Sequence, residues 1–300
     1  MYERFYGLKE RPFDLTPNPR YLFLTAKHRE ALSHLQYGVS GSKGITLLTG
    51  DAGTGKTTLV HAALEQQHDE DTCTVYLCNP ALTRSEFFEF LAAGFGLDSS
   101  TAASKTRLLL DLTRRLIERR AAGSPTALII DEAQCLSDDL LEEIRLLTNI
   151  ETAADKLLPV VLVGQPELAA RLNEPSLRQL KQRVALRCVL PALDEFETGA
   201  YVANRVRIAG GDSRQLFTSQ AIATIYERSG GIPRTISVIC DNALVSGFAA
   251  DERPVGAELI IEVCHDFHVH APAPAAGVAV PSAQPAVRAP PATPHESSFF

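Results

Sequence analysis

Residues 45–57 read ITLLTGDAGTGKT, and this stretch decides the fold of the chain. The apolar run over 45–49 predicts a buried strand, and a glycine-rich turn follows it directly. That turn, GDAGTGKT over 50–57, matches the phosphate-binding pattern GxxxxGK(S/T) in full. A strand precedes this turn and a helix follows it. Its backbone N–H groups and the N-terminus of the helix are therefore expected to point toward one bound phosphate. This context disfavours the alternative of a chance glycine-rich turn.

The turn therefore predicts a site for the phosphates of a nucleotide, expected to be ATP. Lys56 is expected to reach the β- and γ-phosphates, and Thr57 to place its hydroxyl on Mg²⁺. The residues expected to surround the nucleotide are Gly50, Asp51, Ala52, Gly53, Thr54, Gly55, Lys56, Thr57 and Thr58.

Outward from this turn, apolar strands alternate with helical segments as far as residue 191. Further strands are expected over 74–78, 127–130, 159–163 and 184–190. Helices are expected over 27–39, 86–93, 105–120 and around 140–147. Continuous apolar strands that alternate with helices predict a parallel sheet covered on both faces, so the fold class is α/β with a P-loop core.

After residue 191 the pattern changes to helices alone, which predicts a small all-helical lid domain. Its helices are expected over 195–208, 219–228, 233–246 and 257–267. The full organisation predicted is an aromatic and proline-rich linker with a first helix over 1–40, the P-loop core over 41–191, the lid over 192–270 and a tail over 271–300. The tail is rich in proline and alanine and nearly uncharged, so it is expected to be disordered.

The composition is that of an ordinary globular protein, with 45% hydrophobic and 22% charged residues. The formal net charge of -7 disfavours a protein that coats nucleic acid, which would need a local basic patch here. The start MYERFYGLKERP does not read as a secretory leader, and no run approaches the ~18 apolar residues that span a bilayer. A cytoplasmic location is therefore expected.

A second apolar strand, over 127–130, ends in two acids, Asp131 and Glu132. The carboxyl ends of parallel strands meet at the sheet edge where ligands bind. Asp131 is expected to hold Mg²⁺ through its water shell, and Glu132 to polarise the attacking water. The alternative is a strand that ends in solvated acids, which is common but less expected 75 residues after a P-loop.

Gln165 follows the next strand, and its amide could hold the attacking water or contact the γ-phosphate. The alternative is a loop amide that caps the following helix. Three arginines come next, Arg178, Arg183 and Arg187, and one of them placed on a neighbouring subunit's γ-phosphate would stabilise transition-state charge. Solvated surface arginines are the alternative for each.

The turn GGIPR over 230–234 ends one helix with glycines and starts the next with Pro233, which suits a first helical turn. Arg234 would then project from a helix start toward the nucleotide. The alternative is a helix–helix turn with an incidental arginine.

These motifs together resemble an AAA+ ATPase. More closely, the opening FYGLKERPFDLTPNPRYLFLTAKHREALSHLQYG resembles the ExeA/general secretion pathway protein A family. The same is true of DEAQCLSDDLLEEIRLLTN, LVGQPEL, LRQLKQRV and SGGIPRTI, so the resemblance covers roughly residues 1–250. It implies a Walker A site at 50–57, Walker B acids at Asp131 and Glu132, sensor 1 at Gln165, a trans-acting arginine at Arg183 and sensor 2 at Arg234.

The resemblance further implies ATP hydrolysis in a ring-like homo-oligomer that helps assemble envelope machinery for type II secretion, pili or polysaccharide export. Longer family members continue into a transmembrane helix and a peptidoglycan-binding domain. The proline/alanine tail stands there in this sequence, so the chain is expected either to act through a partner protein, which would make any contact with the inner membrane, or to belong to a shorter soluble branch of the family.

Two other functions share the same core. One is a DNA-associated AAA+ ATPase of the transposition-helper kind, which the acidic balance disfavours. The other is a nucleotide switch that barely hydrolyses ATP, which Glu132 disfavours.

Overall fold

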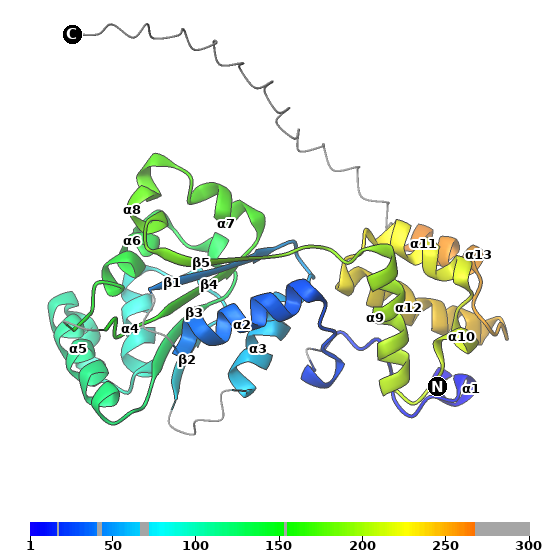
Figure 1. Ribbon diagram of the computed structural model, residues 1–300, viewed down its shortest axis with the longest axis horizontal. Coiled ribbons are helices and arrows are strands. Elements are labelled where there is room, and N and C mark those ends of the chain that lie inside the picture. Colours follow the sequence, from blue (N-terminus) through cyan, green and yellow to red (C-terminus); the bar gives the residue numbers. More distant parts are fainter. Residues whose placement is uncertain (17, 41–43, 67–71, 153–154, 268–300) are drawn as a thin grey trace, which may run out of the picture.

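The computed structural model describes residues 1–16, 18–40, 44–66, 72–152 and 155–267. Figure 1 shows two parts side by side: a sheet with helices on both faces, and a purely helical part. The tail expected to be disordered, over 271–300, lies outside the described residues. Within them, no helix combines the length and the apolar character needed to cross a bilayer.

Five parallel strands form the sheet, in the order β2-β3-β4-β1-β5. Their bounds are β1 (Ile45–Gly50), β2 (Cys73–Leu77), β3 (Thr126–Ile130), β4 (Val160–Gly164) and β5 (Val184–Leu190). Every residue of β1, β3 and β4 is buried, which is why these strands read as continuous apolar runs. The predicted fold class is confirmed, and the carboxyl ends of β1, β3 and β4 meet at one edge.

Helices cover both faces of the sheet through two separate apolar clusters. On one face α2 (Ala26–Ser40) and α3 (Lys56–Glu65) pack on side chains such as Leu48 and Ile129. The other face, with Leu47 and Leu128, is covered by α4 (Arg84–Gly94), α5 (Lys105–Ala121), α6 (Asp138–Leu147), α7 (Pro166–Arg171) and α8 (Arg178–Lys181).

The helical part has its own apolar core. Its helices are α9 (Glu195–Ile208), α10 (Ser213–Leu216), α11 (Ser219–Ser229), α12 (Pro233–Ala249) and α13 (Ala257–Asp266). The first residues of the chain complete this core, because α1 (Tyr2–Tyr6) and Phe13 pack in the same cluster as Val206 and Leu244. Tyr6 also donates a hydrogen bond from its hydroxyl to the carbonyl of Glu252, at 3.1 Å.

The segment 1–40, expected as one linker with a first helix, thus divides its packing between two cores. Its beginning packs in the helical part, whereas α2 packs on the sheet. The described residues between them, 14–16 and 18–24, are called the strap here, and they lie between the two parts (Figure 1). Tertiary packing decides this division. The aromatic residues of this irregular segment are not regularly spaced, so the sequence does not indicate which of the two cores they join.

Phe13 offers a test of this division. It is 1% exposed inside the helical core, so Phe13→Ala should lower the free energy of unfolding by about 3–5 kcal/mol. The matched control is Phe196→Ala in α9, where the ring is 85% exposed and the expected change is within about 0.5 kcal/mol. Urea unfolding measures both variants, and equal small losses would contradict the packing of the N-terminal segment in the helical part.

Candidate nucleotide-binding site

The P-loop leaves the carboxyl end of β1 and wraps around the start of α3. Gly53 and Gly55 adopt positive φ angles of 84° and 95°, a backbone region that glycine enters without strain. A Cβ added to Gly55 would meet nothing within 4 Å, so the backbone there stays open to a ligand. Lys56 is buried and donates from Nζ to the carbonyls of Gly50, at 2.8 Å, and Asp51, at 2.9 Å.

The charge of Lys56 is set by two opposed effects. Burial lowers the pKa of Lys56 below its ordinary value, and the nearby carboxylates of Glu132 and Asp131 raise it in part. These two acids also place negative charge close to a site built for phosphates. A cation at Lys56 therefore offsets charge from both the protein and the ligand.

Asp131 directly follows β3, and its buried carboxylate accepts hydrogen bonds from three donors. Its Oδ2 accepts from the hydroxyl of Thr57 at 2.7 Å and from that of Tyr76 at 2.8 Å, and its Oδ1 accepts from the backbone N–H of Glu132 at 2.9 Å. Burial, together with the Asp131 charge, raises the pKa of Tyr76, so this hydroxyl stays protonated as a donor. The hydroxyl of Thr57 and the Asp131 carboxylate are hard oxygen ligands of the kind that Mg²⁺ prefers.

Glu132 and Gln165 lie near one another at the same sheet edge, joined through a third side chain. The amide of Gln134 donates to the Glu132 carboxylate and accepts from the backbone N–H of Gln165, at 3.0 Å. Gln165 occupies the N-cap position of α7, yet its side chain makes no capping hydrogen bond. Sequence reasoning did not assign Gln134 a role, because it is an ordinary polar residue in a loop.

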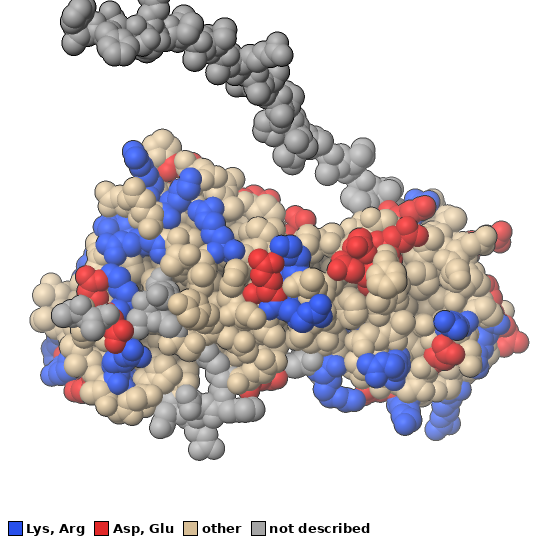
Figure 2. All heavy atoms as spheres, in the orientation of Figure 1, with Lys and Arg blue, Asp and Glu red and all other residues tan. Residues whose placement is uncertain are grey.

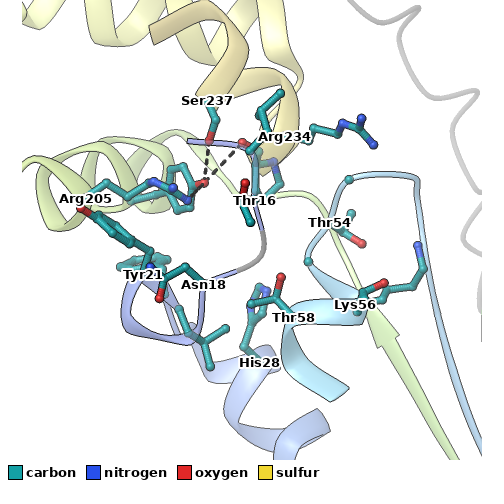
Figure 3. A pocket seen from close by; sticks show the side chains of 18 of the residues that line it. Thr16, Asn18, Tyr21, His28, Thr54, Lys56, Thr58, Arg205, Arg234 and Ser237 are labelled. Atoms are coloured by element: carbon teal, nitrogen blue, oxygen red, sulfur yellow. Dashed lines mark hydrogen bonds between the residues drawn. The ribbon is translucent and has the colours of Figure 1, made fainter. Parts of the chain in front are cut away.

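A cavity of about 410 Å³ lies between the P-loop, the strap and the helical part. Among the expected site residues, Lys56, Thr57, Glu132 and Arg234 line it, as do 52–55 and Thr58. In Figure 3 the strap residues Asn18 and Tyr21 lie on one side of the cavity and the P-loop residues Thr54 and Lys56 on another. Asp131 and Gln165 are not among the lining residues.

The strap wall of this cavity is a feature that sequence reasoning missed. Residues 14–16, 18 and 21–23 line it, together with His28, Tyr201, Arg205 and Ser237. The available signal was the aromatic and polar run around 13–23, which composition alone marks only as a linker. Its distance in sequence from the P-loop hides the contact, which arises when the N-terminal segment packs in the helical part.

Arg205 of α9 attaches the strap to the helical part. Its guanidinium donates to the backbone carbonyls of Pro12 and, at 3.0 Å, Asp14. It also donates to the hydroxyl of Tyr201 at 2.9 Å and lies 4.8 Å from the ring centroid of Tyr21. Carbonyl oxygens and an aromatic ring thus surround the positive charge of the Arg205 guanidinium. They hold the strap against α9, and the two together form one wall of the cavity.

His28 connects the strap side to the P-loop. This buried side chain in the first turn of α2 places Nδ1 2.8 Å from the Thr25 hydroxyl. Burial lowers the pKa of His28, and a hydrogen bond with the backbone of Thr54 opposes that effect in part. The buried His28 side chain thus lies between α2 and the phosphate loop.

Arg234 reaches the P-loop from the start of α12. Its backbone N–H donates to the carbonyl of Gly53 at 3.2 Å, and a Cβ on Gly53 would lie 2.7 Å from that of Arg234. The preceding turn has the expected form, with Gly230 as a left-handed C-cap and Pro233 in the first turn of α12. Arg234 is exposed and projects beside the P-loop (Figure 3).

The three candidate arginines lie away from this cavity. Arg183 precedes β5 at the amino ends of the strands, opposite the carboxyl ends that carry the cavity. Its carbonyl accepts there from the backbone N–H of Ile45, the first residue of β1. Along β1 from there to Gly50 is about 17 Å, at roughly 3.3 Å per residue. Arg178 and Arg187 lie on α8 and β5, and Figure 2 shows basic side chains gathered over the region of α8. The structure therefore brings none of the three to the cavity of its own chain.

Comparisons with known proteins agree with this arrangement. A family model described as an AAA domain matches residues 39–172. General secretion pathway protein A of Aeromonas hydrophila is 46% identical to the chain over 256 residues, which make up 85% of this chain and 46% of that protein. The chain thus spans less than half the length of this relative.

Two solved structures show the same fold. The Aeropyrum pernix ORC2 protein, solved as ADPNP-ADP complexes, aligns with a TM-score of 0.63 and 16% identity, over 86% of this chain and 72% of that chain. Cdc6p from Pyrobaculum aerophilum aligns with a TM-score of 0.63 and 16% identity, over 85% and 70%. The predicted resemblance is thus confirmed: the chain carries an AAA domain and is similar over 85% of its length to general secretion pathway protein A.

Proposed function

We propose that the chain binds ATP with Mg²⁺ in the cavity between the P-loop and the helical part, and that it hydrolyses this ATP as a homo-oligomer. One observation carries the proposal. A phosphate-binding loop with Lys56, the acid Glu132 and the cation Arg234 line a single cavity. A cation at the phosphates, an acid that can activate water and a second cation from the helical part are the groups that phosphoryl transfer to water requires.

The residues present fit both the nucleotide and the metal. The backbone at Gly55 is open to a ligand, and backbone N–H groups at the start of α3 suit phosphate oxygens. Thr57 and Asp131 would hold Mg²⁺ with oxygen ligands, their oxygens being 2.7 Å apart. When bound, the metal would neutralise charge on the β- and γ-phosphates.

The chain's own side chains then take distinct roles. Lys56 would exchange its bonds to the carbonyls of Gly50 and Asp51 for phosphate oxygens. Glu132 would orient the attacking water and accept its proton. Gln165 would hold that water or contact the γ-phosphate, and Arg234 would place positive charge on the phosphates from α12. The strap would hold the rest of the nucleotide against the helical part.

An oligomer is proposed because Arg183 lies at the amino ends of the strands, whereas the cavity of its own chain lies at their carboxyl ends. An arginine there reaches a γ-phosphate only when a second copy of the chain presents its cavity to that end of the strands. Arg183 is half-buried and directly precedes β5. Because β5 is the last strand of the sheet, a neighbouring subunit could approach Arg183 along that strand. Arg178, on α8, and Arg187, in the middle of β5, are the alternatives for this role.

The biological role proposed is to assemble or position envelope machinery, such as a type II secretion system, a pilus or a polysaccharide exporter. This step rests on similarity to general secretion pathway protein A, whose name links it to secretion. We place the chain on the cytoplasmic side of the inner membrane, attached through a partner protein. The predicted domains, with a core over 41–191 and a lid over 192–270, are part of this proposal.

Two substitutions test the hydrolysis. Lys56→Ala should abolish ATP binding, because the phosphates lose the cation of the loop. Glu132→Gln should bind ATP as the wild type does but lose turnover, with at most a slow residual rate left, since an amide cannot accept the proton of water. A fluorescent ATP analogue measures binding, and phosphate release measures turnover. Wild-type turnover in Glu132→Gln would show that Glu132 is not the base.

The metal site is tested by Tyr76→Phe. This variant removes one donor to Asp131 without changing the shape of the side chain. The Mg²⁺ concentration for half-maximal binding of the ATP analogue should rise about 10-fold, the lower end of the ~10–100-fold seen for outer-shell partners. Binding in EDTA should not change. Tyr226→Phe in α11 is the control, and the same Mg²⁺ dependence in both variants would refute the role of Tyr76.

Arg183 is the test of assembly. Arg183→Ala should bind ATP normally and lose turnover by about 10³-fold, the lower end of the range for such arginines. Mixing it with Glu132→Gln should restore some activity, because some interfaces then pair an intact Glu132 with an intact Arg183 from the neighbour. Arg214→Ala, exposed on α10, is the control. Specific activity that does not change with protein concentration, with no restoration on mixing, would refute the trans assignment.

A further inference from the structure

We propose that Gln134 is the positioning residue that orients the Glu132 carboxylate and ties its position to the loop of Gln165. Gln134 lies in the short 3-10 helix η3 (Ala133–Cys135), directly after the Walker B acids. This role rests on the ATP hydrolysis proposed above. It goes beyond that proposal because Gln134 does not line the cavity and would act through Glu132.

The side-chain amide of Gln134 forms a bridge between two strand ends. Its Nε2 donates to Oε2 of Glu132, after β3, and its Oε1 accepts from the backbone N–H of Gln165, after β4. An amide has its donor and its acceptor on different atoms, so the two bonds together fix its orientation. With Oε2 held in this way, Oε1 of Glu132 is the oxygen left for a water in the cavity.

The end of β4 is shaped around this amide. A Cβ added to Gly164 would lie 2.8 Å from Oε1 of Gln134, closer than carbon and oxygen can pack. A side chain at this position would therefore displace the amide of Gln134 or the side chain of Leu168 from its place beside β4. The bridge is a packed contact, since Gln134 is half-buried between the two strand ends.

The main chain of Gln134 is also anchored to α7, the helix whose N-cap residue is Gln165. Arg171 of α7 donates from Nη1 to the carbonyls of Gln134 and Leu136, at 2.8 Å each. The same guanidinium pairs with Asp138 at the start of α6. A shift of α7 or of the Gln165 loop would therefore move both the backbone and the amide of Gln134.

Glu132 itself adopts a backbone conformation that depends on its surroundings. Its φ of 52° is left-handed, which is unfavourable for a residue other than glycine and persists where neighbouring contacts determine it. Its backbone N–H is held by Asp131 and its carboxylate by Gln134. The orientation of the acid thus comes from two specific hydrogen bonds.

Two variants separate this role from a merely structural one. Gln134→Met keeps the length of the side chain and loses both hydrogen bonds. Gln134→Glu keeps an acceptor for the Gln165 N–H and loses the donor to Glu132. The control is Gln220→Glu, which makes the same charge change at an exposed position of α11. Melting temperature and affinity for the ATP analogue are measured for each variant, along with kcat and KM.

If Gln134 orients Glu132, kcat should fall about 10- to 100-fold in both variants, the scale of a misplaced catalytic group. ATP-analogue affinity should stay within about twofold of wild type in both, because neither hydrogen bond involves a phosphate-binding group. The control should keep the wild-type kcat. In the background of Glu132→Gln, adding Gln134→Met should not lower the slow residual single-turnover rate further, since a residue that acts through Glu132 has no effect once that carboxylate is gone.

Three results would overturn the role of Gln134. They are a wild-type or raised kcat in Gln134→Glu, a kcat loss matched by an equal loss of nucleotide affinity, and a further rate loss in the double variant. If Glu132→Gln loses turnover while the Gln134 variants keep the wild-type kcat, only the role of Gln134 fails. If Glu132→Gln hydrolyses ATP at the wild-type rate, the proposed function fails and the role of Gln134 fails with it.

Discussion

The buried carboxylate of Asp131 is the constraint on which the site depends. It is 3% exposed at the end of β3, and a charge at such a depth is tolerated only where hydrogen bonds replace water. Thr57 and Tyr76 supply those bonds from α3 and β2, and the backbone of Glu132 supplies a third. These bonds join α3, which follows the P-loop, to β2 and β3. The bond from the backbone N–H of Glu132 also holds the main chain of that second acid next to Asp131.

The cavity exists because two apolar cores lie next to each other. The chain passes between them twice, through the strap and through the segment between β5 and α9, where the backbone N–H of Leu193 donates to the carbonyl of Gly231. A Cβ on Gly231 would lie 1.9 Å from the Leu193 carbonyl oxygen, so this approach requires glycine. Arg205 holds the strap on α9, so the strap and the helical part together form one wall of the cavity.

Two kinds of polar contact organise the region around the sheet edge. Some hydrogen bonds hold side chains that line the cavity, as those of Lys56 do. Others lie behind the cavity and join two strand ends to each other, as Gln134 does between Glu132 and the loop of Gln165. Buried polar groups joined in this way leave few alternative arrangements, because moving one leaves another without its partner.

The sequence by itself determined the strands, the glycine-rich turn after β1, the position of two acids after β3 and the helix start at Pro233. Each depends on neighbours in the chain: an apolar run of strand length, glycines where φ is positive, and a proline suited to a first turn. Tertiary structure alone decided that Phe13 packs in the helical core, that the strap walls the cavity and that Arg183 lies at the opposite ends of the strands. It also decided the partners of Gln134 and Tyr76. Those contacts join residues far apart in the chain or on different strands, and a local pattern carries no information about which distant groups will meet when the apolar surfaces are buried.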